Sequence, residues 1–470
     1  EHQEKYNFNR NKKGEIIVES GFDGLTRYYN RDLAGKVIKV KRPGDKFTEY
    51  EYDFNGRITR AEHSDKTWET YTYNKDGLLI EAANQHSLVQ LIRDASGKII
   101  TEIQDGYKVE STYDKLGNRT NIKSSLGANI DIERNNLGFI QQVKAIVEKE
   151  NEEHKESEKE QAWTAQFKYN SLGMEVERLL PGGIVNTFKY DKAGRPIQQK
   201  VSKGNREVRN RKYKWNVNDR LTSMVNQLTA GTVNFSHDDF GNLASAQYEN
   251  GEMDYKLPDE VGNLYRTEKR KDREYGPGGQ LLRADDNRFH YDEEGNLIEK
   301  ETPKGNWQYY WFGNGMLKSV LRPDGKTVDF EYDALGRRTA KIFGVSPWGE
   351  MSNGQRGEGV SLWREMPEGQ REDKIPERQK QDGIITRFIW DGNVPLHEWT
   401  YNLKERPNLV VDELGFLVKD KEEQTNNLTT WIFDEGTFKP AAKIVDGEQF
   451  SIITDYLGTP VEMYNIQGEK

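Results

Sequence analysis

The stretch Tyr52-Asp53-Phe54-Asn55-Gly56-Arg57-Ile58 returns in altered form about every 21 residues along the chain. A tyrosine and an aspartate lead each copy, and a glycine follows three residues after the aspartate. Further copies begin at Tyr113, Tyr190, Tyr291 and Tyr332. A fixed period of this length predicts a chain built by repetition of one supersecondary unit.

Each repeat contains two turn signals. The turn glycines align at positions 14, 35, 56, 77, 97, 117, 138, 173, 194, 219, 241, 262, 279, 295, 315 and 336, with Asp219 replacing one glycine. A second signal, such as Gly24, Gly44 or Gly106, lies about halfway between most of these positions. Two turns joined by runs of six to eight residues predict one β-hairpin per unit.

The segments between the turns have the two-residue period of strands. Thr48–Tyr52 and Asn186–Tyr190 alternate aromatic or β-branched residues with polar ones. Glycine permits a positive φ in the turn, and the aspartate can accept hydrogen bonds from the turn backbone. We expect each motif tyrosine to stack on its equivalent in the next unit. The residues expected to build the repeat turns are Tyr52, Asp53, Gly56, Tyr113, Asp114, Gly117, Tyr190, Asp191, Gly194, Tyr291, Asp292, Gly295, Tyr332, Asp333 and Gly336.

The composition favours a sheet over a solid globule. Only 34% of the residues are hydrophobic, 31% are charged, and the mean hydropathy is −0.95, values that approach those of disordered chains. However, aromatic residues make up 11% and there are 43 glycines. We therefore expect an all-β protein with two wetted faces and little solid core, held by aromatic pairs between neighbouring strands.

The repeats divide the chain into three parts. We expect a hairpin array over residues 1–343, with a charged insertion at 147–161 that forms a solvated loop and, as a less favoured alternative, docks a partner. A Gly-rich charged loop follows at 344–383, and strand-like segments resume over 384–470. The chain begins at Glu1 without a methionine or a signal sequence, which we interpret as an internal or processed piece of a longer protein.

The length of the array predicts a winding. Sixteen two-stranded units at about 4.8 Å per strand make a ribbon roughly 150 Å long. Open twisted sheets rarely exceed about 10 strands without curling, so the ribbon is expected to wind. One closed turn would be about 50 Å across, with an interior about 40 Å wide inside a ~10 Å wall. A folded domain of about 100 residues, roughly 34 Å across, would fit inside.

Several function classes find no support. The net charge of −9 comes from 69 basic and 78 acidic residues mixed along the chain, so nucleic-acid binding is disfavoured. There is no cysteine, hence no disulfide or thiolate metal site, and no apolar run long enough for a membrane span. The seven histidines lack the spacing of a zincin site.

Candidate catalytic groups are better explained by turn chemistry. The acidic pairs Asp238-Asp239, Asp285-Asp286 and Glu293-Glu294 lie at expected turns, where carboxylates are commonly solvated. The turns lack the ligand spacing of a calcium loop, and the Gly-Lys pairs lack the glycine pattern of a phosphate loop. We therefore assign no catalytic, cofactor or metal residue.

The repeated Y-D-x-x-G-[RN] turn resembles the YD repeats of Rhs proteins, a family related to the C components of insecticidal toxin complexes and to teneurins. The resemblance covers residues 1–343 and extends to the tail, where Phe388–Gly392 and Phe433–Pro440 resemble the segment before the Rhs core. The most specific tail motif is D-x-L-G-T-P, here Asp455, Leu457, Gly458, Thr459 and Pro460. For this motif a capped turn that helps to close the shell is the favoured interpretation over a separate function.

The resemblance implies a non-enzymatic function. Rhs proteins form a β-shell around a C-terminal toxin, often exported by type VI secretion, which implies a secreted location. The implied partners are the enclosed toxin of the same polypeptide, a secretion spike or adaptor, a chaperone and an immunity protein. From the resemblance we interpret the sequence as ending at Lys470 before the position of the family's core, self-cleavage motif and toxin, and as being without the N-terminal adaptor.

A second hypothesis is a cell-surface adhesive or carbohydrate-binding protein, as for wall-associated and teneurin-like relatives. Trp307, Tyr309, Tyr310 and Trp311 are the aromatic residues that would stack on sugars. A third hypothesis, that the chain is itself an enzyme, has only scattered acidic residues in its favour.

Overall fold

A computed structural model describes residues 5–148, 162–345, 383–411 and 417–470. The prediction of an all-β protein is confirmed, since β-strands are the dominant element and the only helical segments described are three short 3-10 turns, η1 (Pro181–Gly183), η2 (Pro277–Gly279) and η4 (Leu403–Glu405). The expected insertion at 147–161 and the expected loop at 344–383 lie almost entirely outside the described residues.

The first 23 strands form one antiparallel sheet, in which each strand pairs with its neighbours in sequence. We call it the outer sheet. Its strands are β1 (Asn7–Arg10), β2 (Ile16–Ser20), β3 (Thr26–Arg31), β4 (Val37–Lys41), β5 (Phe47–Tyr52), β6 (Ile58–His63), β7 (Trp68–Tyr73), β8 (Leu79–Asn84), β9 (Leu88–Arg93), β10 (Ile99–Gln104), β11 (Tyr107–Tyr113), β12 (Arg119–Ser124), β13 (Ala128–Arg134), β14 (Ile140–Val147), β15 (Trp163–Tyr169), β16 (Glu175–Leu180), β17 (Ile184–Tyr190), β18 (Pro196–Lys203), β19 (Arg206–Trp215), β20 (Leu221–Asn226), β21 (Thr232–His237), β22 (Leu243–Gln247) and β23 (Met253–Tyr255).

A second antiparallel sheet of 14 strands follows, which we call the inner sheet. A small hairpin, β24 (Leu257–Pro258) and β25 (Leu264–Tyr265), separates the two, so the expected ribbon is divided. The inner strands are β26 (Arg273–Tyr275), β27 (Leu281–Ala284), β28 (Asn287–Tyr291), β29 (Leu297–Thr302), β30 (Gly305–Trp311), β31 (Leu317–Leu321), β32 (Lys326–Tyr332), β33 (Arg338–Val345), β34 (Gly383–Asp391), β35 (Val394–Asn402), β38 (Thr429–Phe433), β39 (Pro440–Val445), β40 (Glu448–Thr454) and β41 (Pro460–Asn465). A separate hairpin joins β36 (Leu409–Val411) to β37 (Leu417–Lys419).

The sheet continues past the point where the sequence repeat ends. β33 pairs with β34 over five positions, from Ala340↔Arg387 to Gly344↔Gly383. The strands after residue 383 are thus part of the inner sheet and not a separate body. Backbone pairing needs no sequence motif, so it continues past the last repeat turn wherever strands alternate with turns.

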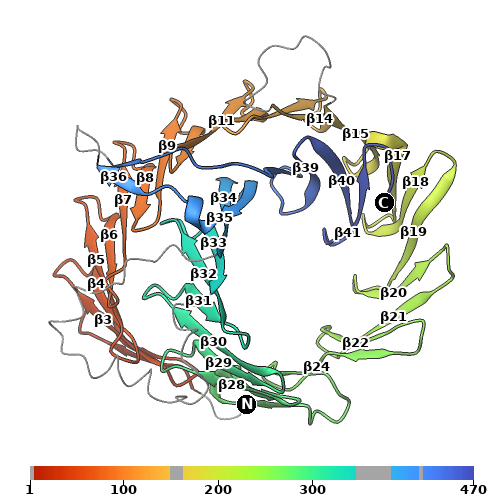
Figure 1. The fold of residues 1–470 in the computed structure, drawn as a ribbon. Helices are drawn as coiled ribbons and strands as arrows, with labels where there is room; N and C mark the ends of the chain where they lie inside the picture. Colours follow the sequence, from red (N-terminus) through yellow and green to blue (C-terminus); the bar gives the residue numbers. More distant parts are fainter. Residues whose placement is uncertain (1–4, 149–161, 346–382, 412–416) are drawn as a thin grey trace.

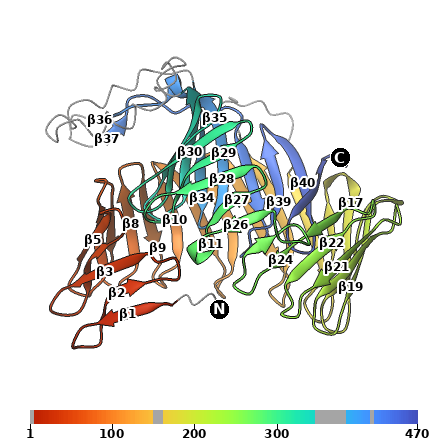
Figure 2. The same cartoon turned by 90° about the horizontal axis from the view of Figure 1, so that it is seen from below.

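The inner sheet lies inside the arc of the outer one. Figure 1 shows the outer sheet passing from β3 through β9 and β15 to β22, β28 to β30 lying at the lower rim between β24 and β3, and β31 to β41 running within the arc. Figure 2, seen from below, shows the strands of both sheets standing side by side as a wall. The ribbon therefore winds upon itself, as its length predicts.

A solid core fills the space where the two sheets face each other. Trp163 and Ile184 of the outer sheet and Ile385, Ile389 and Trp399 of the inner sheet are all at most 1% exposed. The expectation of little solid core is wrong here, because the inner face of one layer is covered by the next. Burial of such side chains stabilises the layer contact by about 1.5–3 kcal/mol each.

The motif turn is built as its sequence indicates. The carbonyl of Asp53 accepts the backbone N–H of Gly56 at 3.0 Å, and Asp53 Oδ1 accepts the N–H groups of Asn55 and Arg57 at 2.9 Å each. Gly56 has φ +83°, the left-handed region that favours glycine. The same pattern recurs in the turns led by Asp114, Asp191, Asp292 and Asp333, and in the tail turn led by Asp455.

The motif tyrosine has a different role from the expected ring stacking. It lies at a register shift, where Glu51 pairs with Arg60 but Tyr52 pairs with Ile58. Its hydroxyl donates to the backbone carbonyl of the first residue in the strand that follows the preceding motif turn. The distances are 2.6 to 3.0 Å in the six pairs Tyr52–Val37, Tyr73–Ile58, Tyr113–Ile99, Tyr190–Glu175, Tyr291–Leu281 and Tyr332–Leu317.

The stacking prediction fails for a geometric reason. Equivalent tyrosines are two strands apart, about 10 Å, whereas ring pairs need centroid distances of roughly 4.5–7 Å. The residue after the preceding glycine covers the ring instead, as Lys36 covers Tyr52 and Arg57 covers Tyr73. The units led by Tyr52, Tyr73 and Tyr113 are therefore fastened to the previous one by a hydrogen bond and a cation–π contact.

Candidate functional site at the seam between the sheets

Hairpin turns of the inner sheet contact the outer sheet along a line that we call the seam. Because strands are antiparallel, alternate turns lie at opposite edges of the ribbon, and all motif turns share one edge. Lys46 Nζ pairs with Asp292 Oδ2 at 2.8 Å, across a separation of 246 residues. Partners along the seam are therefore about twelve repeats apart, which is the length of one winding.

The first contacts of the seam are ionic. Glu294 receives Arg42 at 2.7 Å and Lys46 at 2.9 Å, and all three side chains are at most one-third exposed. Burial opposes the charge of Lys46, but hydrogen bonds to Asp292 and Glu294 outweigh it and raise the pKa of Lys46. Asp292, which the sequence assigns to a repeat turn, and Glu294, which it assigns to a solvated acidic pair, are thus engaged in joining the layers.

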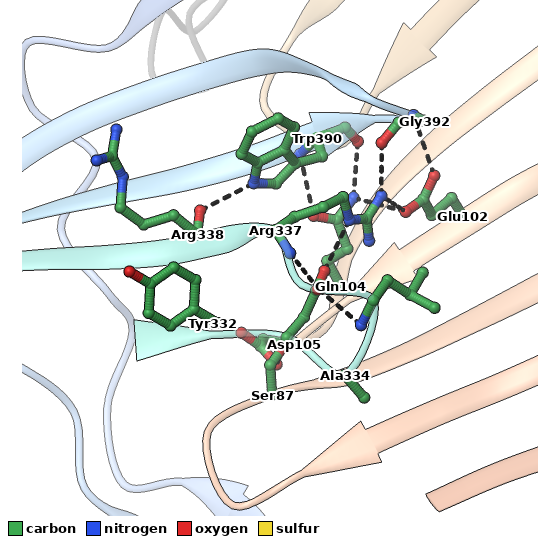
Figure 3. Close-up of polar contacts among 12 residues, drawn as sticks. Ser87, Glu102, Gln104, Asp105, Tyr332, Ala334, Arg337, Arg338, Trp390 and Gly392 are labelled. Atoms are coloured by element: carbon green, nitrogen blue, oxygen red, sulfur yellow. Dashed lines mark hydrogen bonds and ion pairs between the residues drawn. The ribbon is translucent and has the colours of Figure 1, made fainter. Parts of the chain in front are cut away.

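The next part of the seam is a buried polar cluster around Arg337 (Figure 3). Arg337 NH1 donates to Glu102 Oε1 at 2.6 Å and to the Gly392 carbonyl at 2.8 Å, and its Nε donates to Asp333 at 2.7 Å. Gln104 Nε2 donates to the Trp390 carbonyl at 2.6 Å, and Gln104 Oε1 accepts the Trp390 backbone N–H at 3.0 Å. Burial opposes the charge of Arg337, but Glu102 and Asp333 outweigh it and raise the pKa of Arg337.

Further buried ion pairs follow along the inner sheet. Arg387 NH2 contacts Asp105 at 3.2 Å, and Arg387 Nε contacts Glu423 at 2.9 Å. Arg406 makes a two-point contact with Glu331, at 2.7 and 2.8 Å. Burial alone would raise the pKa of Glu331, but the Arg406 pair outweighs it and lowers the pKa to about 2.

The far part of the seam combines ion pairs with a neutral histidine. Arg119 binds both oxygens of Asp391 at 2.7 Å each. His397 is fully buried, with Nε2 2.7 Å from Ser124 Oγ on the outer sheet and Nδ1 3.0 Å from Thr430 Oγ1 on the inner sheet. Burial lowers the pKa of His397 to about 3, so the ring is neutral at pH 7.

The sequence-predicted turn residues divide between two places. Asp292 and Asp333 belong to the seam, whereas Asp53, Asp114 and Asp191 lie on the outer sheet in turns that bind their own backbone. The tail turn also contacts the outer sheet, since Tyr456 packs on Tyr213 with a centroid distance of 5.0 Å. Leu457 of the same turn is 70% exposed.

Sequence reasoning missed most seam residues. Glu102, Gln104, Arg119 and His397 occupy ordinary strand positions, and nothing local distinguishes them from solvated polar residues. The only available signal is a period of about twelve repeats between partners, which becomes visible once the winding length is known.

The aromatic run proposed for sugar stacking is not one surface. Trp307, Tyr309 and Trp311 alternate with Tyr310 along β30, so Tyr310 faces the opposite side of the sheet. Trp311 Nε1 donates to the Leu297 carbonyl at 2.8 Å, and Arg322 lies over the Trp307 ring. Two of the four rings are therefore engaged within the sheet.

One group of possible metal ligands occurs in the part of the chain that the structure describes. Donor atoms of His290, Glu299 and Glu301 lie within 4.8 Å of one another. The 3.0 Å hydrogen bond from His290 Nε2 to Glu301 explains this proximity without an ion. Across those same residues, none of the helices has the length and apolarity needed to span a membrane.

Comparison with known proteins finds a shell family model and similarity to proteins with toxin and nuclease names. A family model described as Teneurin YD-shell matches residues 182–343. The chain is 27% identical over 331 residues to the double-stranded DNA deaminase toxin A of Burkholderia cenocepacia (strain H111), covering 67% of this chain and 21% of that protein. It is 26% identical over 212 residues to the probable deoxyribonuclease RhsA of Dickeya dadantii (strain 3937), covering 38% of this chain and 14% of the relative.

Solved structures show the same fold at low identity. The crystal structure of TcdB2-TccC3 matches 99% of this chain and 25% of its own, with a TM-score of 0.68 and 11% identity. The Photorhabdus luminescens Tc holotoxin pore matches with a TM-score of 0.56 at 9% identity, over 99% of this chain and 24% of its own. The chain thus spans a quarter or less of the length of each of these four proteins.

Proposed function

This chain is an Rhs/YD-repeat protein, and from that premise we propose that it forms the wall of a shell that encloses a toxin segment of a longer polypeptide. The observation that carries the proposal is the winding of the ribbon upon itself, held by the seam. A wall that overlaps itself and is fastened at each winding can separate a guest from the surrounding solution.

The proposed wall is non-enzymatic. Its buried charged groups include pairs that join the layers, such as Arg337 with Glu102 and Arg387 with Asp105. Groups with such partners stabilise a contact and are poorly placed to act on a substrate. The deaminase and deoxyribonuclease activities in the relatives' names are those proteins' own, and we propose that any toxic activity here resides outside residues 1–470.

The proposed guest determines the expected partners and location. The guest belongs to the same polypeptide, and an immunity protein, a chaperone and a secretion spike or adaptor would act with it. Export from a bacterial cell, by a type VI system or another machine, follows from a role in toxin delivery. The relative that is named a toxin supports export as part of the proposal.

Protection of the guest from protease tests the proposal. The natural polypeptide is digested with a nonspecific protease, and survival of the C-terminal guest is followed by mass spectrometry. We expect the guest to resist digestion in the native protein and to become accessible in Arg119→Ala, which removes the two-point contact with Asp391. Lys115→Ala, on an exposed turn, is the matched control. Digestion of the guest at the rate of the isolated guest would refute the enclosing role.

A further inference from the structure

Two neighbouring hairpins of the inner sheet separate near their turns. β35 pairs with β38 at only two positions, His397↔Thr430 and Glu398↔Thr429. By contrast, β34 pairs with β35 over eight positions, and β38 pairs with β39 over five. Figure 1 shows β34 and β35 standing apart from β39 along the inner sheet.

A partly open cavity of about 420 Å³ lies at this separation. The outer sheet supplies its apolar wall, with Ile122, Ile132, Trp163 and Phe167, and the inner sheet contributes Leu396 among others. Trp163 is fully buried, and Ile132 is 8% exposed. An apolar cavity of about 150 Å³ already binds benzene, so this volume accommodates about two to three ring-sized groups.

The charged groups around the cavity disfavour an anionic ligand. Arg119 neutralises Asp391, whereas Arg178 serves two carboxylates, Glu175 and Asp434. Glu435 also lines the cavity, and its partner is Arg134. These four carboxylates face three guanidinium groups, so a ligand anion would meet an excess of negative charge.

Two polar groups on the cavity's lining residues lack partners. Arg119 Nε and Trp431 Nε1 are buried N–H donors that have no hydrogen-bond acceptor. A buried donor without an acceptor costs about 1–3 kcal/mol, and a ligand hydroxyl or carbonyl oxygen placed against Arg119 Nε would remove part of this cost.

From the volume, the apolar wall, the negative rim and the free donors, we infer that the cavity is a binding site for an uncharged, mainly apolar small molecule with one hydrogen-bond acceptor. Such a ligand contacts both sheets at once and would tighten the seam between Arg119 and Arg178. This inference is independent of the enclosing role, because it concerns the wall itself.

The probe for the test is 2-naphthol, with 2-naphthoate as an anion of similar size, and binding to the protein is measured by isothermal titration calorimetry at pH 7. We expect one 2-naphthol per chain, binding of 2-naphthoate at least about tenfold weaker, and a melting temperature that rises with 2-naphthol concentration. Arg119→Lys keeps the charge opposite Asp391 but removes Nε–H, and should weaken 2-naphthol binding about fivefold.

Filling the cavity provides the decisive comparison. Ala441 lines it and is 4% exposed, so Ala441→Leu should reduce 2-naphthol binding at least about tenfold. Ala193→Leu makes the same change on an exposed turn and should bind as the native protein does. Should Ala441→Leu fail to fold, Val143→Phe fills the same cavity from β14.

Three results would each overturn the inference. They are the absence of saturable 2-naphthol binding to the native protein, equal binding by the folded filling variant, and tighter binding of 2-naphthoate. The first two would show that the cavity takes no such ligand, and the third would reverse the assigned ligand class.

Discussion

Mild acid is expected to destabilise the contact between the two sheets through His397. Ser124 Oγ accepts the N–H groups of Ala128 at 3.1 Å and Leu126 at 3.3 Å, so its hydroxyl hydrogen is directed to His397 Nε2 at 2.7 Å. The remaining ring N–H, on Nδ1, donates to Thr430 Oγ1 at 3.0 Å. A second ring proton would face a hydroxyl that already acts as donor, inside an apolar core.

The size of the expected loss of stability follows from the shift in the pKa of His397. The pKa of His397 falls from 6.5 in the unfolded chain to about 3 in the folded one, because burial disfavours the charged ring. The group thus contributes stability that is complete above pH 6.5 and is lost as the pH falls toward 3. Between pH 7 and pH 5, the free energy of unfolding should decrease by about 2 kcal/mol through this residue.

The assay is urea unfolding at pH 7, 6 and 5, followed by tryptophan fluorescence, for the native protein and for His397→Gln. Glutamine retains one donor and one acceptor but does not titrate. Between pH 7 and pH 5, the free energy of unfolding of His397→Gln should therefore fall by about 2 kcal/mol less than that of the native protein. Glu331 has a lowered pKa and loses its contribution only below pH 4.5, outside the measured interval. Equal pH dependence of the two proteins would refute the assignment of the proton to His397.

Three further predictions concern the units and the seam. Tyr113→Phe removes the 2.8 Å hydrogen bond to the Ile99 carbonyl and should lower the free energy of unfolding by about 1 kcal/mol, whereas Tyr248→Phe, at an exposed tyrosine, should leave it unchanged; thermal and urea unfolding measure both. Arg337→Met leaves Glu102 and Asp333 buried without their cation and should lower the free energy of unfolding by about 3–5 kcal/mol. Adding Glu102→Gln in a double variant should restore part of this loss. Unchanged stability of Arg337→Met would show that the cluster does not hold the layers together. Gly56→Ala should cost about 1–2 kcal/mol because φ is +83°, and Gly56→Asn should cost less, as Asp219 already occupies the equivalent position with φ +60°; equal melting temperatures for the two variants would contradict this ordering.

Local chemistry explains why the repeat turns could be predicted. An aspartate that accepts the N–H groups two and four residues later, and a glycine with positive φ, act within five residues, so their spacing is visible in the sequence. Strand alternation likewise depends on neighbours along the chain. The tyrosine was recognised but misinterpreted, because its partner is a backbone carbonyl 15 residues earlier and carries no sequence signal.

The seam required the tertiary structure. Ser124 and His397 are 273 residues apart, and Arg337 and Glu102 are 235 apart, so each pair depends on how tightly the ribbon winds. A small change in twist between neighbouring strands accumulates over about twenty strands and shifts every such pair. The cavity depends on the same geometry, because it arises where β35 and β38 lose their pairing against the wall.

By itself, the sequence determined the hairpin unit, its turns and an all-β ribbon long enough to wind, since these follow from hydrogen bonds and periodicities within about 21 residues. Only the tertiary structure decided that the ribbon splits into two sheets, that the sheets enclose a core, and that Arg119, Arg337 and His397 join them. The physical reason is distance along the chain: contacts between windings depend on the summed twist of many strands, which no local pattern encodes.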